Sequence, residues 1–293
     1  ESYSKAQLSM TLLSTSINFD LHVFELFVPL SSGTTVRLAK DALSLPNEIT
    51  LINTVPSKIR ALLDVGQLPE SVETLNLAGE PLQQSLALQI FKHTQVNTLI
   101  NLYAPSETTT YSTWIALNKD KGFVPYIGRP ISNTQIYIVD DHLQPVPLGV
   151  VGEIYIGGAG VARGYLNRPE LTAERFIADP FSDEPDARLY KTGDLARYLP
   201  DGNIEYLGRN DFQVKIRGFR IELGEIEAKL VQCQNVREAI VIAREDIPGD
   251  KRLVAYLLAD EGTVIDAAQL RTELASVLAE YMLPSAFMTL PQF

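Results

Sequence analysis

Short apolar runs alternate with amphipathic segments along the first 121 residues of the chain. The apolar runs occupy residues 49–55, 72–78 and 96–102 and are rich in Val, Ile, Leu and Thr, which favours strands. Residues 56–63 and 82–93 are predicted to be helices, and a proline opens the first of them, where it removes no hydrogen bond. Strands that alternate with helices at this spacing predict a parallel sheet with helices packed on it.

The pattern changes near residue 124 to short β segments and turns. Residues 134–139 and 152–156 flank a connection rich in proline and glycine, which predicts a hairpin or a small barrel. A third pattern follows Asp211. We expect a helix at residues 224–232, strands at 239–243 and 253–258, and a helix that Asp266 caps and that carries Leu270, Leu274 and Leu278.

These patterns predict an α/β fold in two parts. The first part spans residues 1–210, with an α/β portion to about residue 121 and a β-rich portion over residues 122–210, which the family resemblance described below implies to be a β-barrel. The second part, residues 211–293, is a small α+β domain. The chain opens without methionine and stops in an apolar stretch, so we expect it to be a piece of a longer protein.

Composition and charge narrow the class of protein. The formal net charge of −11 argues against a surface that binds nucleic acid or an anionic membrane. No apolar run approaches the roughly 18 residues of a membrane helix. A single cysteine, Cys233, excludes an internal disulfide and a cysteine-based zinc site, so we predict a reducing, cytoplasmic location. The histidines His22, His93 and His142 show no metal-ligand spacing.

The densest group of chemically useful residues lies within residues 189–227. Asp194 follows a tight Thr-Gly turn, and a carboxylate presented in this way can accept both hydroxyls of a ribose. Arg209, at the predicted domain corner, can reach the same nucleotide. A dense basic strand follows, with Lys215, Arg217 and Arg220. A solvated charged face without a role in binding is the alternative interpretation of these three residues.

Residues 101–111 (NLYAPSETTTY) form a second candidate segment, in which a strand runs into a turn with several hydroxyls and one carboxylate. Hydroxyls can donate to phosphate oxygens, and Glu107 can hold a magnesium ion; a plain hydrophilic loop is the alternative. The glycine-rich residues 157–164 (GGAGVARG) lack the Gly-Lys-Ser/Thr ending of a phosphate loop, so a structural turn is the better interpretation.

Together these segments resemble the amino-acid adenylation domains of nonribosomal peptide synthetases, within the adenylate-forming, AMP-binding enzyme superfamily. The likeness covers essentially the whole chain and is carried by residues 189–227, 152–176 and 101–107. The last of these resembles Asn-x-Tyr-Gly-Pro-Thr-Glu, with Ala104 in place of Gly and Ser106 in place of Thr. The resemblance implies the adenylate-forming fold: part of a large domain with α/β layers and a small β-barrel, followed by a small α+β domain.

The resemblance also implies roles in a nucleotide site. Residues 189–227 place Asp194 on the ribose, Tyr206 against the adenine and Arg209 on the nucleotide, while residues 101–107 place Tyr103 on the adenine, Ser106 at the α-phosphate and Glu107 on magnesium. The implied set is Gly79, Tyr103, Ala104, Ser106, Asp194, Tyr206 and Arg209 for ATP or AMP, with Glu107, Arg209 and Asp194 as catalytic residues. Asp211 is the implied hinge, and residues 212–222 form a loop that moves toward the site after adenylation.

Residues 16–26 (SINFDLHVFEL) resemble the element that sets an aspartate, here Asp20, against the substrate α-ammonium; from the residues alone, a helix cap is the alternative. The implied amino acid pocket comprises Asp20, Leu21, Phe24, Asn53, Asn76, Ala78, Leu102, Thr110 and Tyr111. Its bulky members and its lack of a second charge predict a small neutral substrate, and the combination looks like those associated with alanine.

The implied reaction is the formation of an aminoacyl-adenylate from an amino acid and Mg-ATP, followed by transfer to a phosphopantetheine thiol. The implied partners are a peptidyl carrier domain and a condensation domain. The family's phosphate loop and catalytic lysine are expected before residue 1 and after residue 293, so we expect this chain alone to be nearly inactive. The alternatives are an acyl-CoA synthetase or stand-alone ligase of the superfamily, and a non-catalytic nucleotide-binding or carrier-docking fragment.

Overall fold

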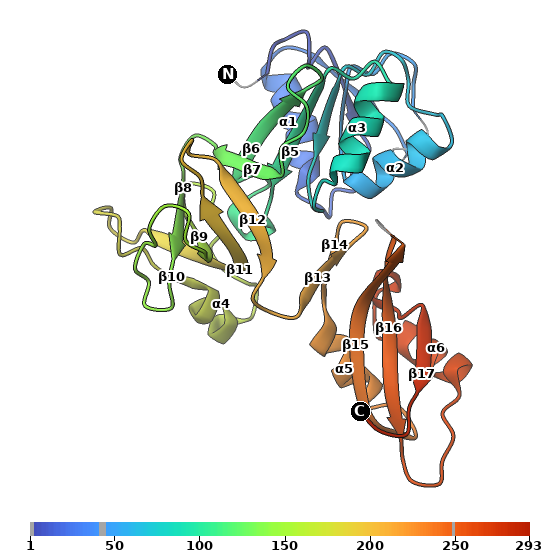
Figure 1. The fold of residues 1–293 in the computed structure, drawn as a ribbon. Coiled ribbons are helices and arrows are strands. Elements are labelled where there is room, and N and C mark those ends of the chain that lie inside the picture. Colours follow the sequence, from blue (N-terminus) through green and yellow to red (C-terminus); the bar gives the residue numbers. More distant parts are fainter. Residues whose placement is uncertain (1–2, 41–44, 248–249) are drawn as a thin grey trace. The chain divides into compact units, whose positions relative to one another are not determined.

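A computed structural model describes residues 3–40, 45–247 and 250–293 of the chain. The fold divides along the sequence into two compact units, Glu1–Asn210 and Asp211–Phe293 (Figure 1). Each unit has a hydrophobic core of its own, and each is described separately below.

The first unit begins with five parallel strands in the order β2-β1-β3-β4-β5. The strands are β1 (Met10–Leu13), β2 (Thr35–Leu38), β3 (Leu51–Thr54), β4 (Thr74–Leu77) and β5 (Thr98–Tyr103), and the helices are α1 (Leu21–Ser31), α2 (Pro56–Asp64) and α3 (Gln84–His93). All residues of β3 and β4 are buried, which explains why the sequence shows continuous apolar runs there instead of alternation. The predicted parallel sheet is confirmed.

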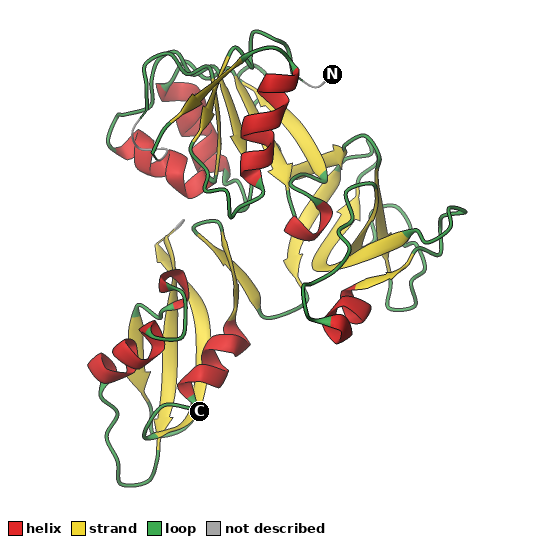
Figure 2. Cartoon of the chain, turned by 180° about the vertical axis from the view of Figure 1, so that it is seen from behind, coloured by secondary structure: helices red, strands yellow, loops and turns green. Residues whose placement is uncertain are grey.

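Helices cover both faces of this sheet (Figures 1 and 2). Successive strand residues point to opposite faces, and β5 shows the consequence. Leu99 packs in a core cluster with residues of α2 and α3, such as Ile59 and Ile90. Its neighbour Ile100 packs in a different cluster with Phe24 of α1. The α1 side therefore has a small core of its own.

The antiparallel half of the unit continues from β5 in one connected path, β5-β6-β7-β12-β11-β9-β8, with β10 paired to β11. Its elements are η1 (Ser106–Thr108), β6 (Thr113–Asn118), β7 (Tyr126–Pro130), β8 (Thr134–Val139), β9 (Gly152–Gly158), α4 (Pro169–Arg175), β10 (Phe176–Ala178), β11 (Arg188–Tyr198) and β12 (Ile204–Arg209). The predicted hairpin of residues 134–139 and 152–156 is confirmed, because β8 and β9 pair antiparallel. Gly128 is required in β7, since a β-carbon there would clash with the backbone carbonyl of Trp114.

The second unit joins a hairpin to a three-stranded sheet backed by helices. Its elements are β13 (Gln213–Ile216), β14 (Phe219–Glu222), α5 (Leu223–Leu230), β15 (Val236–Ile247), β16 (Asp250–Ala259), α6 (Ala267–Ala275), η2 (Glu280–Met282) and β17 (Ala286–Thr289). The strand order of the sheet is β15-β16-β17. Asp266 caps α6 as predicted, accepting from the backbone N–H groups of Ala268 and Gln269 at 2.8 and 3.3 Å.

Residues 212–222, expected to be a loop, form the β13–β14 hairpin instead. Lys215 and Arg220 are opposite each other in its register. Arg217 and Gly218 make the turn with φ of 51° and 79°, and two positive φ values are what a tight type I′ hairpin turn needs. The basic residues Lys215 and Arg220, which the sequence indicates are part of a strand, thus lie on the two paired strands of this hairpin.

Two leucines of α3 give a matched test of this packing. Leu86 is 1% exposed in the core beneath the helix, whereas Leu88 is 49% exposed on its outer side. We expect Leu86→Ala to lower the free energy of unfolding by about 2–5 kcal/mol, because it removes buried surface and leaves a cavity. Leu88→Ala should cost less than about 1 kcal/mol. Urea unfolding of the two variants measures both values, and equal losses would contradict the assigned face of α3.

Candidate functional site

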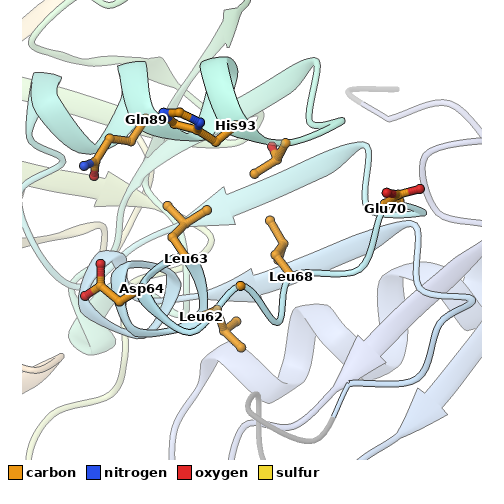
Figure 3. Close-up of a pocket in the computed structure, with 9 residues that line it drawn as sticks. Leu62, Leu63, Asp64, Leu68, Glu70, Gln89 and His93 are labelled. Carbon is orange, nitrogen blue, oxygen red and sulfur yellow. The ribbon is translucent and has the colours of Figure 1, made fainter.

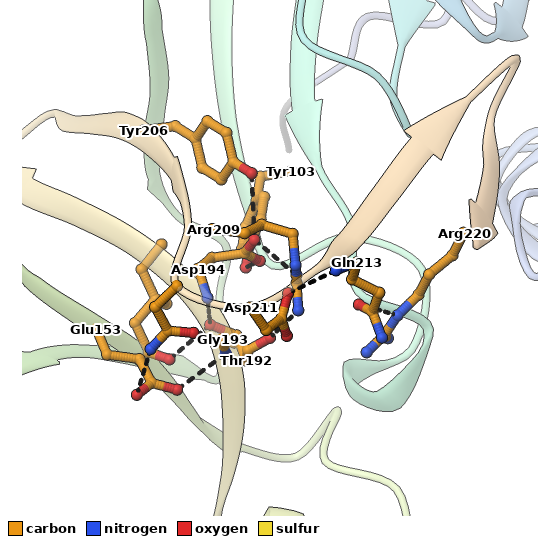
Figure 4. A network of polar contacts seen from close by, with 12 residues as sticks. Tyr103, Glu153, Thr192, Gly193, Asp194, Tyr206, Arg209, Asp211, Gln213 and Arg220 are labelled. Atoms are coloured by element: carbon orange, nitrogen blue, oxygen red, sulfur yellow. Dashed lines mark hydrogen bonds and ion pairs between the residues drawn. The ribbon is translucent and has the colours of Figure 1, made fainter. Parts of the chain in front are cut away.

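The carboxylate of Asp194 is the centre of a buried polar cluster (Figure 4). Antiparallel pairing of β11 and β12 sets Asp194 opposite Arg209, whose Nη1 donates to Asp194 Oδ1 at 2.8 Å. The Tyr206 hydroxyl donates to the same oxygen at 3.2 Å, and the Tyr103 hydroxyl, at the end of β5, donates to Oδ2. Asp194 is only 3% exposed, so its charge is matched by a guanidinium and two phenols instead of by water.

A β-bulge in β11 presents this carboxylate. The register between β11 and β9 is interrupted between Lys191 and Leu195, where Gly193 adopts a φ of +76°. The Gly193 N–H donates to Glu153 Oε1 at 2.9 Å, and the Asp194 N–H donates to Thr192 Oγ1 at 2.9 Å. Side chains thus replace the strand hydrogen bonds that the bulge removes, which is how a bulge can re-aim a functional residue.

Glu153 also accepts a hydrogen bond from Asn210, the last residue of the first unit. Its second oxygen, Oε2, accepts from Asn210 Nδ2 at 3.2 Å, and the Asn210 N–H donates to the Gly193 carbonyl at 2.9 Å. One carboxylate on β9 therefore fixes the residue before Asp194 and the residue after Arg209. In the next residues of the chain, Asp211 Oδ1 accepts from the Gln213 N–H at 3.1 Å, at the start of β13.

Burial keeps the Tyr103 phenol of this cluster protonated. It raises the pKa of Tyr103 well above its usual value, and the neighbouring Asp194 carboxylate raises it further. Tyr103 and Tyr206 also lie near each other, with ring centroids 6.3 Å apart. The cluster therefore presents two aromatic rings beside a carboxylate and a guanidinium.

The turn after β5 carries Glu107 and is held by the glycine-rich segment. Glu107 Oε1 accepts from the Tyr165 hydroxyl at 2.6 Å. Thr109 and Thr110 both adopt left-handed φ values, of 60° and 65°, which are uncommon for threonine. Thr109 Oγ1 donates to the Gly160 carbonyl at 2.8 Å, so residues 157–164 act as the structural turn that the sequence suggested. Strain of this kind persists only where the surroundings fix it.

Asp20 joins this turn to helix α1. It occupies the N-cap position of α1, yet its side chain makes no capping hydrogen bond, so the helix-cap alternative is wrong. Its Oδ2 accepts from the Thr110 N–H at 3.3 Å, and its carbonyl accepts from Thr110 Oγ1 at 3.1 Å. Asp20 and Thr110, 90 residues apart in the sequence, are thus adjacent.

Four of the predicted pocket residues, Phe24, Ala78, Leu102 and Tyr111, share one buried cluster, with Leu21 packed against it. The rings of Phe24 and Tyr111 meet edge to face, with centroids 5.6 Å apart. Asn53 and Asn76, both fully buried, lie on β3 and β4 in direct register. The structure therefore gathers these residues on the α1 side of the sheet.

The two asparagines differ in how they are satisfied. Asn53 accepts from the Tyr111 hydroxyl, whereas Asn76 Oδ1 accepts from the Tyr3 hydroxyl at 3.1 Å. Within the described residues, Asn76 Nδ2 is buried and has no hydrogen-bond partner. A buried donor of this kind is costly unless another acceptor reaches it.

The remaining predicted residues occupy less distinctive positions. Gly79 follows β4 with a φ of +81°, Ala104 packs against the Phe24 cluster, and Ser106 opens η1. Arg220 is not a simple solvated charge, because its Nε donates to Gln213 Oε1 at 2.6 Å across the hairpin. Sequence reasoning missed Glu25, Glu153 and Tyr165. The last two lie within residues 152–176, for which the sequence predicts only the structural turn at residues 157–164.

A separate cavity of about 490 Å³ lies on the opposite, α2–α3 side of the sheet (Figure 3). It is lined by Leu62, Leu63, Asp64, Gly66, Leu68, Glu70, Gln89, His93 and Thr94, and includes none of the predicted site residues.

Across residues 3–40, 45–247 and 250–293, no helix has the length and apolar character needed to cross a bilayer. The same residues contain no group of three or more His, Cys, Asp or Glu side chains placed to hold a metal ion.

Comparison with known proteins identifies the family. The model of the AMP-binding enzymes matches residues 4–166, and that of the AMP-binding enzyme C-terminal domain matches residues 225–293. A linear gramicidin synthase of Brevibacillus parabrevis is 53% identical over 98% of this chain, which spans 6% of that protein. A dimodular nonribosomal peptide synthase of Bacillus subtilis is 44% identical over 100% of this chain, which spans 12% of that protein.

Two solved structures show the same fold. The adenylation domain AlmE of Vibrio cholerae, in complex with glycyl-adenosine-5'-phosphate, superposes with a TM-score of 0.84 at 25% identity, over 97% of this chain and 56% of that one. The four-domain nonribosomal peptide synthetase AB3403, bound to AMP and glycine, gives a TM-score of 0.62 at 36% identity, over 98% of this chain and 22% of that one. The chain therefore belongs to the AMP-binding enzymes, as an adenylation domain of the nonribosomal peptide synthetase kind.

The burial of Tyr103 predicts an unusual alkaline titration. The stability that its hydrogen bond supplies is complete below about pH 10, where an unfolded tyrosine ionises, and is lost as pH rises through the higher pKa of the folded chain. In the native chain at about pH 11, Tyr103→Phe should leave the phenolate absorbance unchanged. In urea the same variant should lose the signal of one of the 12 tyrosines. Loss of one phenolate from the native protein, with its fold verified by circular dichroism, would contradict the assigned environment.

Proposed function

We propose that this domain activates a small neutral amino acid for nonribosomal peptide synthesis. An oxygen of the substrate carboxylate attacks the α-phosphorus of ATP, the bond to pyrophosphate breaks, and an aminoacyl-adenylate forms. A phosphopantetheine thiol on a carrier domain then attacks the acyl carbon, and AMP leaves as the thioester forms. The observation that carries the proposal is the presence, in one unit, of the Asp194 cluster and of the apolar Phe24 cluster, with Asp20 bonded to Thr110 next to Tyr111 of that cluster.

The Asp194 cluster is suited to the nucleoside part of ATP. Asp194 already accepts hydrogen bonds from hydroxyl groups, and ribose hydroxyls are donors of the same kind. Tyr103 and Tyr206 supply aromatic rings for the base. Arg209 contributes a guanidinium that stays ionised and can balance phosphate charge. We assign Gly79, Ala104 and Ser106 to the same nucleotide site on the strength of the family resemblance.

Glu107 fits the role of magnesium ligand. Magnesium is commonly held by one or two carboxylates together with substrate phosphates and water, so no larger group of protein ligands is needed. Tyr165 and the backbone around Gly160 hold this carboxylate and its turn in place. When bound, the ion would neutralise charge on the phosphates of ATP. The fixed geometry of the turn would limit reorganisation during the reaction.

The pocket on the α1 side fits a small amino acid side chain. Asp20 would pair with the α-ammonium of the substrate. Phe24, Leu102 and Tyr111 fill much of the volume next to them. Relatives that bind glycine or its adenylate support a small substrate, and alanine is our proposal for this chain. An acyl-CoA synthetase is disfavoured, because Asp20 and the amide of Asn76 offer polar groups that a fatty acid would leave unpaired.

We further propose cytoplasmic action within an assembly line that supplies carrier and condensation domains, with Asp211 as the hinge between the two half-reactions. The resemblance assigns the family's phosphate loop and one catalytic lysine to segments other than these 293 residues. We therefore propose that this chain by itself is nearly inactive, so activity is measured on the adenylation domain at the full length of its relatives.

The amino acid assignment predicts the outcome of ATP–pyrophosphate exchange with a panel of amino acids. Alanine should give the strongest exchange, because the pocket is small and carries no second charge. Asp20→Ala should reduce kcat/KM for alanine at least about 100-fold, since it removes the partner of a buried ammonium. Asp183→Ala, which removes an exposed aspartate in a loop, should have no effect. Preference for a large or charged amino acid would discard the pocket assignment, and persistence of exchange in Asp20→Ala would discard its role.

The nucleotide assignment predicts a different kinetic change for Asp194→Asn. The amide cannot accept the same set of charge-assisted hydrogen bonds, so we expect the KM for ATP to rise about 10- to 100-fold. The KM for the amino acid should change little, because the pocket is a separate cluster. Asp201→Asn, on an exposed turn, is the matched control. An unchanged KM for ATP in Asp194→Asn would remove Asp194 from the nucleotide site.

A further inference from the structure

Helix α1 contains a carboxylate that the proposed reaction does not use. Glu25 is 0% exposed, more deeply buried than either Asp194 or Glu107. In the described part of the chain, no lysine or arginine side chain pairs with it. Burial raises its pKa, while the hydrogen bonds that it accepts act in the opposite direction. Burying a carboxylate that has no cationic partner costs free energy, so the hydrogen bonds that it accepts must account for its position.

Four hydrogen bonds converge on Glu25 from two directions. On one side, Oε2 accepts from the backbone N–H groups of Ser14 and Thr15 at 2.9 and 3.1 Å, and Oε1 accepts from the Thr15 hydroxyl at 2.5 Å. On the other side, Oε1 accepts from Asn53 Nδ2 at 3.2 Å. The first set ties the end of β1 to α1, whereas the second reaches the proposed amino acid pocket.

The bond to Asn53 determines how the pocket wall is arranged. Asn53 Nδ2 donates to Glu25 Oε1 and, at 3.4 Å, to the Leu21 carbonyl. Both oxygens only accept hydrogen bonds, so together they select the N–H end of the Asn53 amide and turn Oδ1 the other way. That oxygen then accepts from the Tyr111 hydroxyl. The ring of Tyr111 is in turn packed edge to face against Phe24. A chain of contacts therefore runs from Glu25 through Asn53 to an aromatic ring of the pocket.

We propose that Glu25 is a positioning residue that fixes the selectivity of the amino acid pocket through Asn53 and Tyr111. With the amide of Asn53 held in one orientation, the Tyr111 hydroxyl and Asn53 Oδ1 satisfy each other, and neither is available to a polar substrate side chain. The pocket then favours an apolar side chain over one with a hydroxyl group. This inference rests on the proposed function and identifies what sets its substrate preference.

Glutamine at position 25 tests the inference because it keeps the size and loses the acceptor-only character. A glutamine amide can donate as well as accept, so the Asn53 amide can turn over and leave Tyr111 without its acceptor. We expect Glu25→Gln to raise the KM for alanine about tenfold and to leave the KM for ATP unchanged. The ratio of kcat/KM for alanine over serine should fall at least fivefold.

Thr15→Ala is the matched control. It removes one donor to Glu25 from the β1 side and leaves the Asn53 contact in place. We expect it to lower thermal stability without altering the alanine-to-serine ratio. If Glu25 only held β1 against α1, Glu25→Gln and Thr15→Ala would change the alanine-to-serine ratio alike, and the proposal would be overturned.

A double-mutant cycle with Tyr111→Phe shows whether the effect passes through Tyr111. Once the hydroxyl is gone, Glu25→Gln should change the alanine-to-serine ratio less than twofold further. A full fivefold change in the Tyr111→Phe background would mean that Glu25 acts by another route, and the proposal would fail.

A measurement independent of turnover separates this inference from the proposed function. In the free domain, the side-chain NH₂ of Asn53 should be protected from hydrogen exchange in wild type and in Thr15→Ala, and should lose protection in Glu25→Gln. Unchanged protection in Glu25→Gln would refute the positioning role, whatever the substrate. Absence of exchange of ATP with pyrophosphate for every amino acid, alongside the expected loss of protection, would refute only the proposed function.

Discussion

The structure of the first unit depends on the satisfaction of one buried anion. Asp194 cannot be left unpaired at 3% exposure without a large loss of stability, so Arg209 and two tyrosines must converge on it. These partners come from β5 and β12, whereas Asp194 itself lies at the end of the bulge in β11. The constraint therefore links the last parallel strand to the antiparallel half of the same sheet, and it creates a polar site at their junction.

The turn after β5 extends this arrangement to the second cluster. Tyr103 precedes the turn and belongs to the Asp194 cluster, whereas Tyr111 follows it and belongs to the pocket. Between them, Thr109 and Thr110 are held in left-handed conformations by bonds to Gly160 and Asp20. A single strained turn thus sets the spacing of the two clusters, which matters in a reaction that requires two substrates to be aligned.

The sequence was a good guide where burial alone determines structure. Apolar runs identified β3, β4 and β5, and the cap residue Asp266 identified α6. The sequence was less informative where contacts between residues distant in the sequence determine the structure. Strand β11 was not predicted, because its polar positions are satisfied by a bulge and by Glu153, 40 residues away from Gly193. Helix α1 is indicated in the sequence only by Asp20 as a possible cap, because it contains Pro29 and its aspartate makes no capping bond with its side chain.

The candidate functional site shows the same difference between residues recognisable in the sequence and residues whose role depends on long-range contacts. Resemblance to a family singled out Asp194, Glu107 and Asp20, because each lies in a recognisable motif. It gave no role to Glu25, whose partner Asn53 is 28 residues away and whose importance is visible only from its burial and contacts. The structure then brought Tyr103, Tyr206 and Arg209 onto one carboxylate, which no spacing in the sequence could show.

The most direct test of the two-cluster assignment is a crystal structure of the full-length adenylation domain with a non-hydrolysable alanyl-adenylate analogue. We expect the ribose hydroxyls on Asp194, the adenine beside Tyr206, and the α-ammonium on Asp20, with the methyl group against Phe24 and Tyr111. An analogue that binds with its ribose away from Asp194, or with its ammonium away from Asp20, would contradict the assignment of the two clusters.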